Sequence, residues 1–267
     1  DWRNLYSALH VLSRRFLYLS QYNVEPDELH VMHLGVGQEL LGSVLWHLVF
    51  IMMAGDAMSN MHAVWADVVD IYIRDGTWTR FNTVNINSFT GGKSPQSGYF
   101  ARLKGKGAEV KHLLFPILEV FRKHIRPTDA TGMDNLILEC LETYGNIVES
   151  FDGWRDGLFL PPHVARQVLL WCDQCCHQYI SLAQWADTMN LALFCVKPKL
   201  HWFWHLCHRC QYLHPRAGNC FLDENFVGKV KRVVISSSFG EPLHMVPNMV
   251  MSKWIAGKKM MLKLQQS

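Results

Sequence analysis

Apolar residues recur every three or four positions along most of this chain, which is the spacing of one face of an α-helix. Alternating patterns typical of strands are nearly absent. The sequence therefore predicts a mainly α protein, a helical bundle with helices at residues 2–19, 28–53, 56–75, 108–124, 132–151, 161–189 and 201–212. One more helix is expected after Asp223, and a basic helix at the end of the chain. The short apolar run at residues 191–200 fits either a strand or a turn.

The most apolar stretch lies inside the predicted helix at residues 28–53. Asp27 stands directly before it, where an N-cap residue is expected. His47 interrupts the apolar run at residues 40–55, which is shorter than the roughly 18 to 20 residues of a membrane-spanning helix. We therefore expect a buried core helix and no membrane as a partner.

Charge divides the chain into two predicted parts. Residues 197–267 carry eleven basic and three acidic residues, a net charge of +8, whereas residues 1–196 carry 15 basic and 20 acidic residues, a net charge of −5. We predict a helical domain at 1–196 and a basic C-terminal helical segment at 197–267 that packs on this domain. An irregular loop is expected within the domain at about 77–106, where the sequence is rich in Asn, Gly, Ser and Pro. The basic segment is compatible with an anionic partner.

Composition limits the class of protein and the compartment. With 49% hydrophobic and 18% charged residues, the chain of 267 residues can bury a large core. Its opening segment contains Arg3, Arg14 and Arg15 and does not have the pattern of a signal peptide, so we expect a piece of a longer protein that is not secreted. Eight cysteines without such a signal favour a reducing compartment, nuclear or cytoplasmic.

Cysteine and histidine pairs are candidate metal ligands. Two Cys-x-x-Cys pairs could bind Zn²⁺ and comprise Cys172, Cys175, Cys207 and Cys210. Both pairs lie in apolar helical patterns, so buried core thiols are the alternative. His201 and His205 lie one turn apart on one face of a predicted helix, a spacing found in metal sites and in phosphate positioning; packing residues with hydrogen-bonded tips are the alternative.

Three carboxylates suggest a different chemistry. Asp27, Asp223 and Glu224 could hold a divalent ion, because hard oxygen ligands suit Mg²⁺ or Mn²⁺ in nucleic-acid strand transfer. By position, Asp27 is equally a helix cap, and Asp223 and Glu224 are equally first-turn acids favoured by the helix dipole.

Four segments occur in an order that resembles a known family. The segment PDELHVMHLGVGQELLGSVLWHLV resembles the Asp-x-x-His segment of eukaryotic DDE/D cut-and-paste transposases. It is followed by LKGKGAEVKHLLFPILEVF, by KPKLHWFWHL and by NCFLDENFVGKVKRVV, the last resembling the segment with the final catalytic Glu. The resemblance implies an RNase H-like core with a large helical insertion, of which this chain would hold the insertion and the C-terminal part.

The resemblance also implies roles for individual residues. Asp27 would be the second catalytic carboxylate and Glu224 the third, together holding Mg²⁺ or Mn²⁺. His201 and His205 would have a structural or DNA-contacting role. The side chains expected to contact DNA phosphates are Lys229, Lys231, Arg232 and Lys253.

Two departures from the family pattern limit the activity we expect. The first catalytic Asp has no match in this chain, and no Cys stands three residues before His177 as the family's Cys-x-x-His element requires. The complete protein would cleave and transfer DNA strands, whereas this piece would be inactive alone. The alternatives are a non-catalytic helical interaction or DNA-binding module and a zinc-stabilised helical protein.

Overall fold

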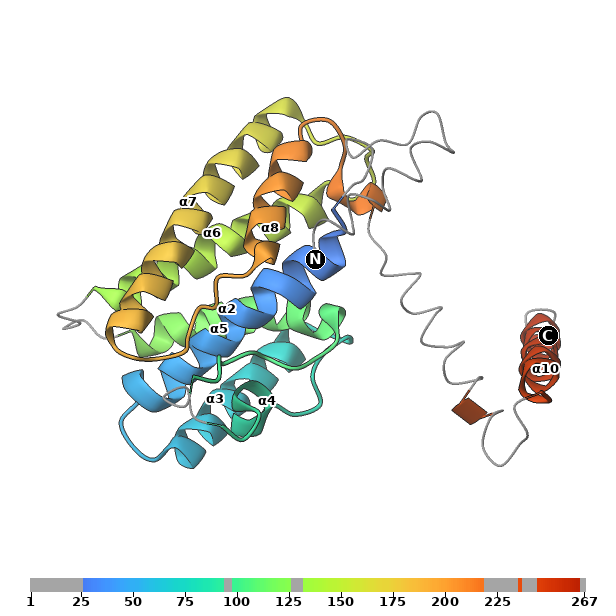
Figure 1. Ribbon diagram of the computed structural model, residues 1–267, viewed down its shortest axis with the longest axis horizontal. Coiled ribbons are helices and arrows are strands. Elements are labelled where there is room, and N and C mark those ends of the chain that lie inside the picture. Colours follow the sequence, from blue (N-terminus) through green and yellow to red (C-terminus); the bar gives the residue numbers. More distant parts are fainter. Residues whose placement is uncertain (1–25, 94–97, 126–131, 219–234, 237–243, 265–267) are drawn as a thin grey trace. The chain divides into compact units, whose positions relative to one another are not determined.

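A computed structural model describes residues 26–93, 98–125, 132–218, 235–236 and 244–264 (Figure 1). These residues form helices, turns and irregular segments and contain no β-strand, so the predicted mainly α helical bundle is confirmed. The chain divides into two compact units, Asp1–Asn219 and Cys220–Ser267. The predicted helices at residues 2–19 and after Asp223 lie outside the described residues.

A continuous central helix runs through the first unit. It consists of the π-helical stretch η2 (Leu29–Gly37), helix α2 (Gln38–His47) and a second π-helical stretch, η3 (Leu48–Met52). The backbone N–H groups of Leu29 and His30 donate to the Asp27 carboxylate at 3.3 and 3.0 Å, which confirms the predicted N-cap.

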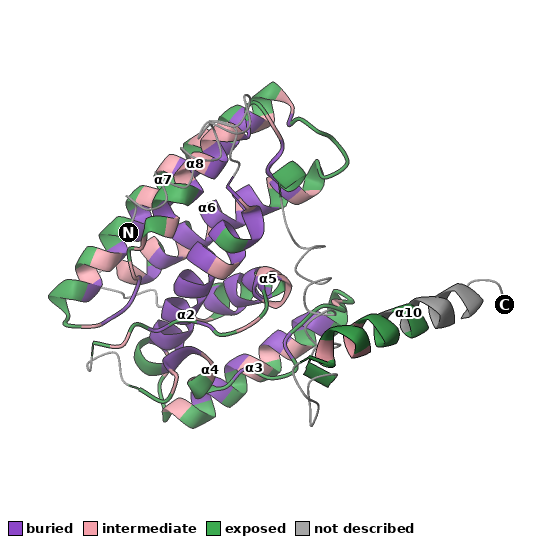
Figure 2. Cartoon of the chain, turned by 45° about the vertical axis from the view of Figure 1, so that its right-hand side comes forward, coloured by how far each residue is buried: buried purple, intermediate pink, exposed green. Residues whose placement is uncertain are grey.

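The central helix is the core of the fold. Leu29–Met52 spans 24 residues, and its most apolar stretch of 18 residues has a mean hydropathy of 1.4, enough by length and composition to cross a membrane. Protein buries 83% of that stretch. Every residue of α2 is buried, as its purple colour in Figure 2 shows. The predicted buried core helix is therefore confirmed.

Three helices pack directly against different parts of this central helix. Helix α3 (Ala57–Arg74) lies against η3 and against α5 (Gly107–His124), and the short helix α4 (Ile86–Thr90) lies against α2. Asp56 caps α3, because its carboxylate accepts the N–H groups of Met58 and Ser59 at 3.1 and 3.0 Å. Helix α4 falls inside the stretch at 77–106 that we predicted to be irregular, and a reciprocal capping box between Asn85 and Ser88 holds its first turn.

Three further helices follow along the chain in the first unit (Figure 1). Helices α6 (Met133–Gly153) and α7 (Pro162–Thr188) form a long antiparallel pair, and α8 (Pro198–Arg209) contacts both α7 and η2. The run at 191–200 is a turn followed by the start of α8. Phe194 adopts a left-handed φ of 50°, and its buried N–H donates to the Ser43 hydroxyl at 2.8 Å.

The division between the units differs from the predicted boundary at 196/197. Helix α8 belongs to the first unit, because its apolar face is buried against η2 and α7, and the 3₁₀ turn η5 (Pro215–Gly218) follows in that unit. In the second unit, α10 (Val246–Leu264) matches the predicted basic terminal helix. Its exposed residues appear green in Figure 2.

Candidate functional site

Asp27 and His30 form a pair at the start of the central helix. The Nδ1 atom of His30 hydrogen-bonds to the same Asp27 carboxylate that caps the helix. The side chain of Asp27 keeps 21% of its surface exposed and that of His30 keeps 52%. The Asp-x-x-His spacing thus places a carboxylate in a fixed orientation, with an imidazole against it, where solvent reaches both.

A second acid–imidazole pair begins at the next residue of the chain and is buried. Glu28 and His33 are 3.5 Å apart, and both side chains are almost fully buried. Burial lowers the pKa of His33, and Glu28 opposes that shift. The chain that follows α8 also returns to this region, because His214 Nε2 lies 3.1 Å from the Phe151 carbonyl oxygen and Glu28 acts electrostatically on His214.

His201 and His205 lie together on the outer face of α8, as their spacing predicts. Their Nε2 atoms are 3.0 Å apart. The opposite face of α8 is buried and consists of Leu200, Phe203, Leu206 and Cys207. The His205 ring also lies against the rings of Trp202 and Trp204, so the alternative of packing residues with hydrogen-bonded tips stays open for this pair.

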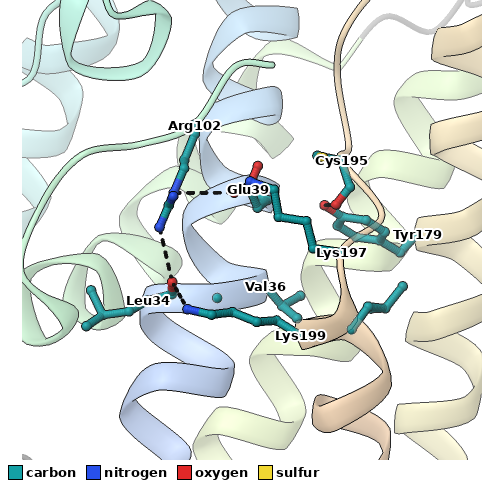
Figure 3. Close-up of a pocket in the computed structure, with 10 residues that line it drawn as sticks. Leu34, Val36, Glu39, Arg102, Tyr179, Cys195, Lys197 and Lys199 are labelled. Carbon is teal, nitrogen blue, oxygen red and sulfur yellow. Dashed lines mark hydrogen bonds and ion pairs between the residues drawn. The ribbon is translucent and has the colours of Figure 1, made fainter. Parts of the chain in front are cut away.

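A small basic pocket lies where η2, α2 and α8 meet the segment before α5 (Figure 3). Its volume is about 70 Å³, and its polar lining includes Glu39, Arg102, Tyr179, Cys195, Lys197 and Lys199. Glu39 is buried, and its Oε1 atom lies 2.5 Å from Lys197 Nζ and 3.3 Å from Arg102 Nε. Its Oε2 atom is buried without a hydrogen-bond partner among the described residues.

The remaining cation of the pocket is fixed by a backbone carbonyl. Lys199 Nζ donates to the Leu34 oxygen at 2.9 Å, and Arg102 donates to the same oxygen at 3.4 Å (Figure 3). A Cβ atom at Gly35 would lie 2.8 Å from Lys199 Cδ, so glycine allows this close approach. Burial and then the charge of Arg102 lower the pKa of Lys199. Three cations surround one carboxylate, which leaves an excess of two positive charges suited to an anionic group.

The pocket was not among the predicted sites. Arg102 and Lys199 reach the Leu34 carbonyl from 68 and 165 positions away along the chain. The sequence contributed one signal, the two lysines of KPK in the basic segment, but nothing in it marked Glu39 or Arg102.

The four candidate zinc ligands are buried free thiols that lie among other cysteines. The Cys172 thiol interacts with the thiols of Cys176 and Cys207, whereas the Cys175 thiol interacts with that of Cys140 on α6. Burial raises the pKa of Cys210 to about 12. Within the described part of the chain, no three His, Cys, Asp or Glu side chains converge in a group that could hold a metal ion.

The other predicted site residues fall mainly in the second unit. Lys253 lies on α10, and its ammonium group donates to the Ser236 carbonyl oxygen at 2.7 Å. The predicted site residues outside the described ranges are Glu224, Lys229, Lys231 and Arg232.

Comparison with protein-family models, with curated proteins and with solved structures finds no match to this chain.

Proposed function

We propose that this chain is part of a DNA transposase-like protein, built of an RNase H-like core with a helical insertion. The complete protein would cleave and transfer DNA strands in a reaction that depends on a divalent metal ion. Asp27 and Glu224 would be two of its metal-binding carboxylates. The chain alone would be inactive, because the resemblance matches no residue here to the first catalytic Asp.

One observation carries this proposal. Two of the segments that resemble the family, one containing Asp27 and the other KPKLHWFWHL, lie on η2 and α8, which pack against each other. The Lys199–Leu34 hydrogen bond joins positions 165 residues apart. Helices α3 to α7 lie between these two segments in the sequence. They are therefore arranged like an insertion whose first and last residues lie close together in the fold. Such an arrangement is needed if carboxylates on either side of the insertion are to share an ion.

Chain length is consistent with the assignment of Glu224. His214 is held at the end of the central helix where Asp27 lies, and Glu224 follows it by ten residues. Ten residues span at most about 33 to 36 Å when fully extended. The connection is therefore long enough for Glu224 to reach the Asp27 end of the helix.

The Asp27 carboxylate has the chemistry that this role requires. Carboxylate oxygens are the ligands preferred by Mg²⁺ and Mn²⁺. The helix N–H groups and His30 fix the orientation of the carboxylate, and its exposure allows an ion and a DNA strand to approach. A bound ion would activate the attacking oxygen and stabilise the leaving oxygen.

A strand-transfer assay with the full-length protein tests the assignment. We expect Asp27→Asn and Glu224→Gln each to lower activity more than about 100-fold, since even residues that only support metal ligands contribute about 10- to 100-fold. Asp56→Asn is the matched control, because Asp56 caps α3 through the same two kinds of hydrogen bond. Activity unchanged by both the Asp27 and Glu224 substitutions would overturn the catalytic assignment.

The basic pocket favours a second candidate, a DNA-binding module without chemistry. The first unit carries a local cluster of positive charge made by Arg102, Lys197 and Lys199. The net charge of its sequence does not indicate such a cluster. Fluorescence anisotropy with a DNA duplex at several salt concentrations tests this function. Arg102→Gln and Lys199→Gln should each reduce the slope of log K against log salt by about 1. Lys106→Gln, at a lysine whose side chain is 85% exposed and lies outside the pocket lining, is the control. An unchanged slope in both pocket variants would contradict the proposal.

A further inference from the structure

The outer face of α8 holds two imidazoles in an unusually close arrangement. His201 and His205 bring their Nε2 atoms to 3.0 Å, with the ring centroids 4.4 Å apart and the ring planes at 80°. We propose that these two histidines bind a transition-metal ion of the Zn²⁺ class, at a site separate from the Asp27 carboxylate. This site does not depend on the proposed transposase function.

The distance between the two nitrogen atoms is close to the one a metal requires. Zinc–nitrogen bonds are about 2.0 to 2.1 Å long, so two nitrogen ligands at a tetrahedral angle lie about 3.3 to 3.4 Å apart. The two Nε2 atoms therefore need to separate by only about 0.3 to 0.4 Å, which small side-chain rotations supply. In the metal-free pair one Nε2–H donates to the other Nε2, so the accepting nitrogen already directs its lone pair toward the space between the rings. The donating imidazole must carry its proton on Nδ1 instead before its Nε2 can bind a metal.

The surroundings keep the pair available to a metal. His201 is exposed and His205 is half-buried, so an ion can enter from solvent. Burial lowers the pKa of His205, and the neighbouring His201, Arg209 and His208 lower it further. The neutral imidazole is the form that binds metals.

His208 gives a contrast within the same helix. Its Nε2 atom lies 3.5 Å from an Asp173 carboxylate oxygen, and its ring stacks on Trp204 with centroids 3.7 Å apart. The indole N–H of Trp204 donates to that same oxygen at 2.9 Å. His208 thus interacts with Asp173 of α7 and with Trp204.

Two imidazoles leave positions of a tetrahedral ion open to water or to an anionic ligand. The site is therefore an open one, with imidazole ligands that favour Zn²⁺, Cu²⁺ and Ni²⁺ over Mg²⁺. Competition with Mg²⁺ distinguishes it from a carboxylate site, because an excess of Mg²⁺ should not displace the bound ion.

The test is a calorimetric titration of the purified chain with Zn²⁺ at about pH 7 in the presence of excess Mg²⁺. We expect His201→Gln, His205→Gln and the double variant to weaken one Zn²⁺ site at least about tenfold, as expected on loss of an imidazole ligand. His208→Gln and His62→Gln, at histidines outside the pair, should bind as the wild type does.

A spectroscopic measurement makes the result independent of folding and of the cysteines. Electron paramagnetic resonance of the wild-type chain with one equivalent of Cu²⁺ should show coupling to nitrogen ligands, and the double variant should lose that coupling while its circular dichroism is unchanged. Nitrogen coupling that persists in the double variant, or the same loss in His208→Gln, would overturn the proposal. Strand-transfer activity is not a readout of this site, so its failure and that of the proposed function are distinguishable.

Discussion

At Gly42 the central helix lies close to the backbone of another segment. A Cβ atom added there would lie 2.6 Å from both Arg102 Cα and Leu103 N. Leu103 also donates its N–H to the Gln38 carbonyl oxygen at 2.9 Å, which holds the segment against the helix. For Gly42→Ala, overpacking against backbone that cannot rotate away costs about 3 kcal/mol, and the helix preference of alanine returns about 1 kcal/mol. We therefore expect a loss of about 2 kcal/mol in the free energy of unfolding.

Urea unfolding followed by circular dichroism measures this loss. Gly153→Ala is the matched control, because Gly153 also lies in a helix and nothing approaches its Cβ position within 4 Å. That variant should be as stable as the wild type or more stable by up to about 1 kcal/mol. Because the same contact positions Arg102 in the basic pocket, Gly42→Ala should also weaken DNA binding. Equal stability of the Gly42→Ala and wild-type chains would refute the close approach and the magnitude derived from it.

Three further predictions concern buried polar groups. The pKa of His33 is lowered in the fold, so the unfolded chain takes up the proton of this side chain first as pH falls. The free energy of unfolding should therefore fall as pH drops below about 6.5, by up to about 1.4 kcal/mol per pH unit. Thermal melts of His33→Gln should show a flatter pH dependence than those of the wild type, and an equally steep pH dependence would contradict the assignment. Asp134→Ala leaves His47, its partner at 2.8 Å, buried and should cost about 3 to 5 kcal/mol in urea unfolding, unlike a typical surface substitution. Asn60→Ala removes the side-chain donor to the Val49 carbonyl oxygen at 2.9 Å and should lower the free energy of unfolding by about 1 to 3 kcal/mol. Amide hydrogen exchange at the end of the central helix should accelerate in this variant, and unchanged exchange would contradict the role of Asn60 in holding that end.

Most helices of the described residues could be predicted because their buried faces repeat at helical spacing. In α3, for example, Val64, Val68 and Ile71 are buried at intervals of three and four residues. Helix α4 was missed, because five residues make less than two turns and show no period. Its cap, in which Asn85 and Ser88 exchange hydrogen bonds, is the one local signal that marks it.

The candidate sites separate into local and non-local parts for the same reason. The Asp27 cap and the shared face of His201 and His205 follow from spacings of a few residues, and the structure confirms both. The basic pocket combines Glu39 with cations from distant segments, and no periodicity determines which distant side chains converge. The catalytic pairing of Asp27 with Glu224 stays a prediction.

The position of α8 in the sequence has a consequence for synthesis of the protein. Lys199 follows Leu34, whose carbonyl it covers, by 165 residues. Ribosomes add about 5 to 20 residues per second, so the apolar central helix is made roughly 8 to 33 s before the helix that completes its cover. During that interval, the nascent chain carries a long apolar segment with one side open. Its yield in cells should therefore depend on chaperones that hold such segments, and slower synthesis would lengthen the exposure.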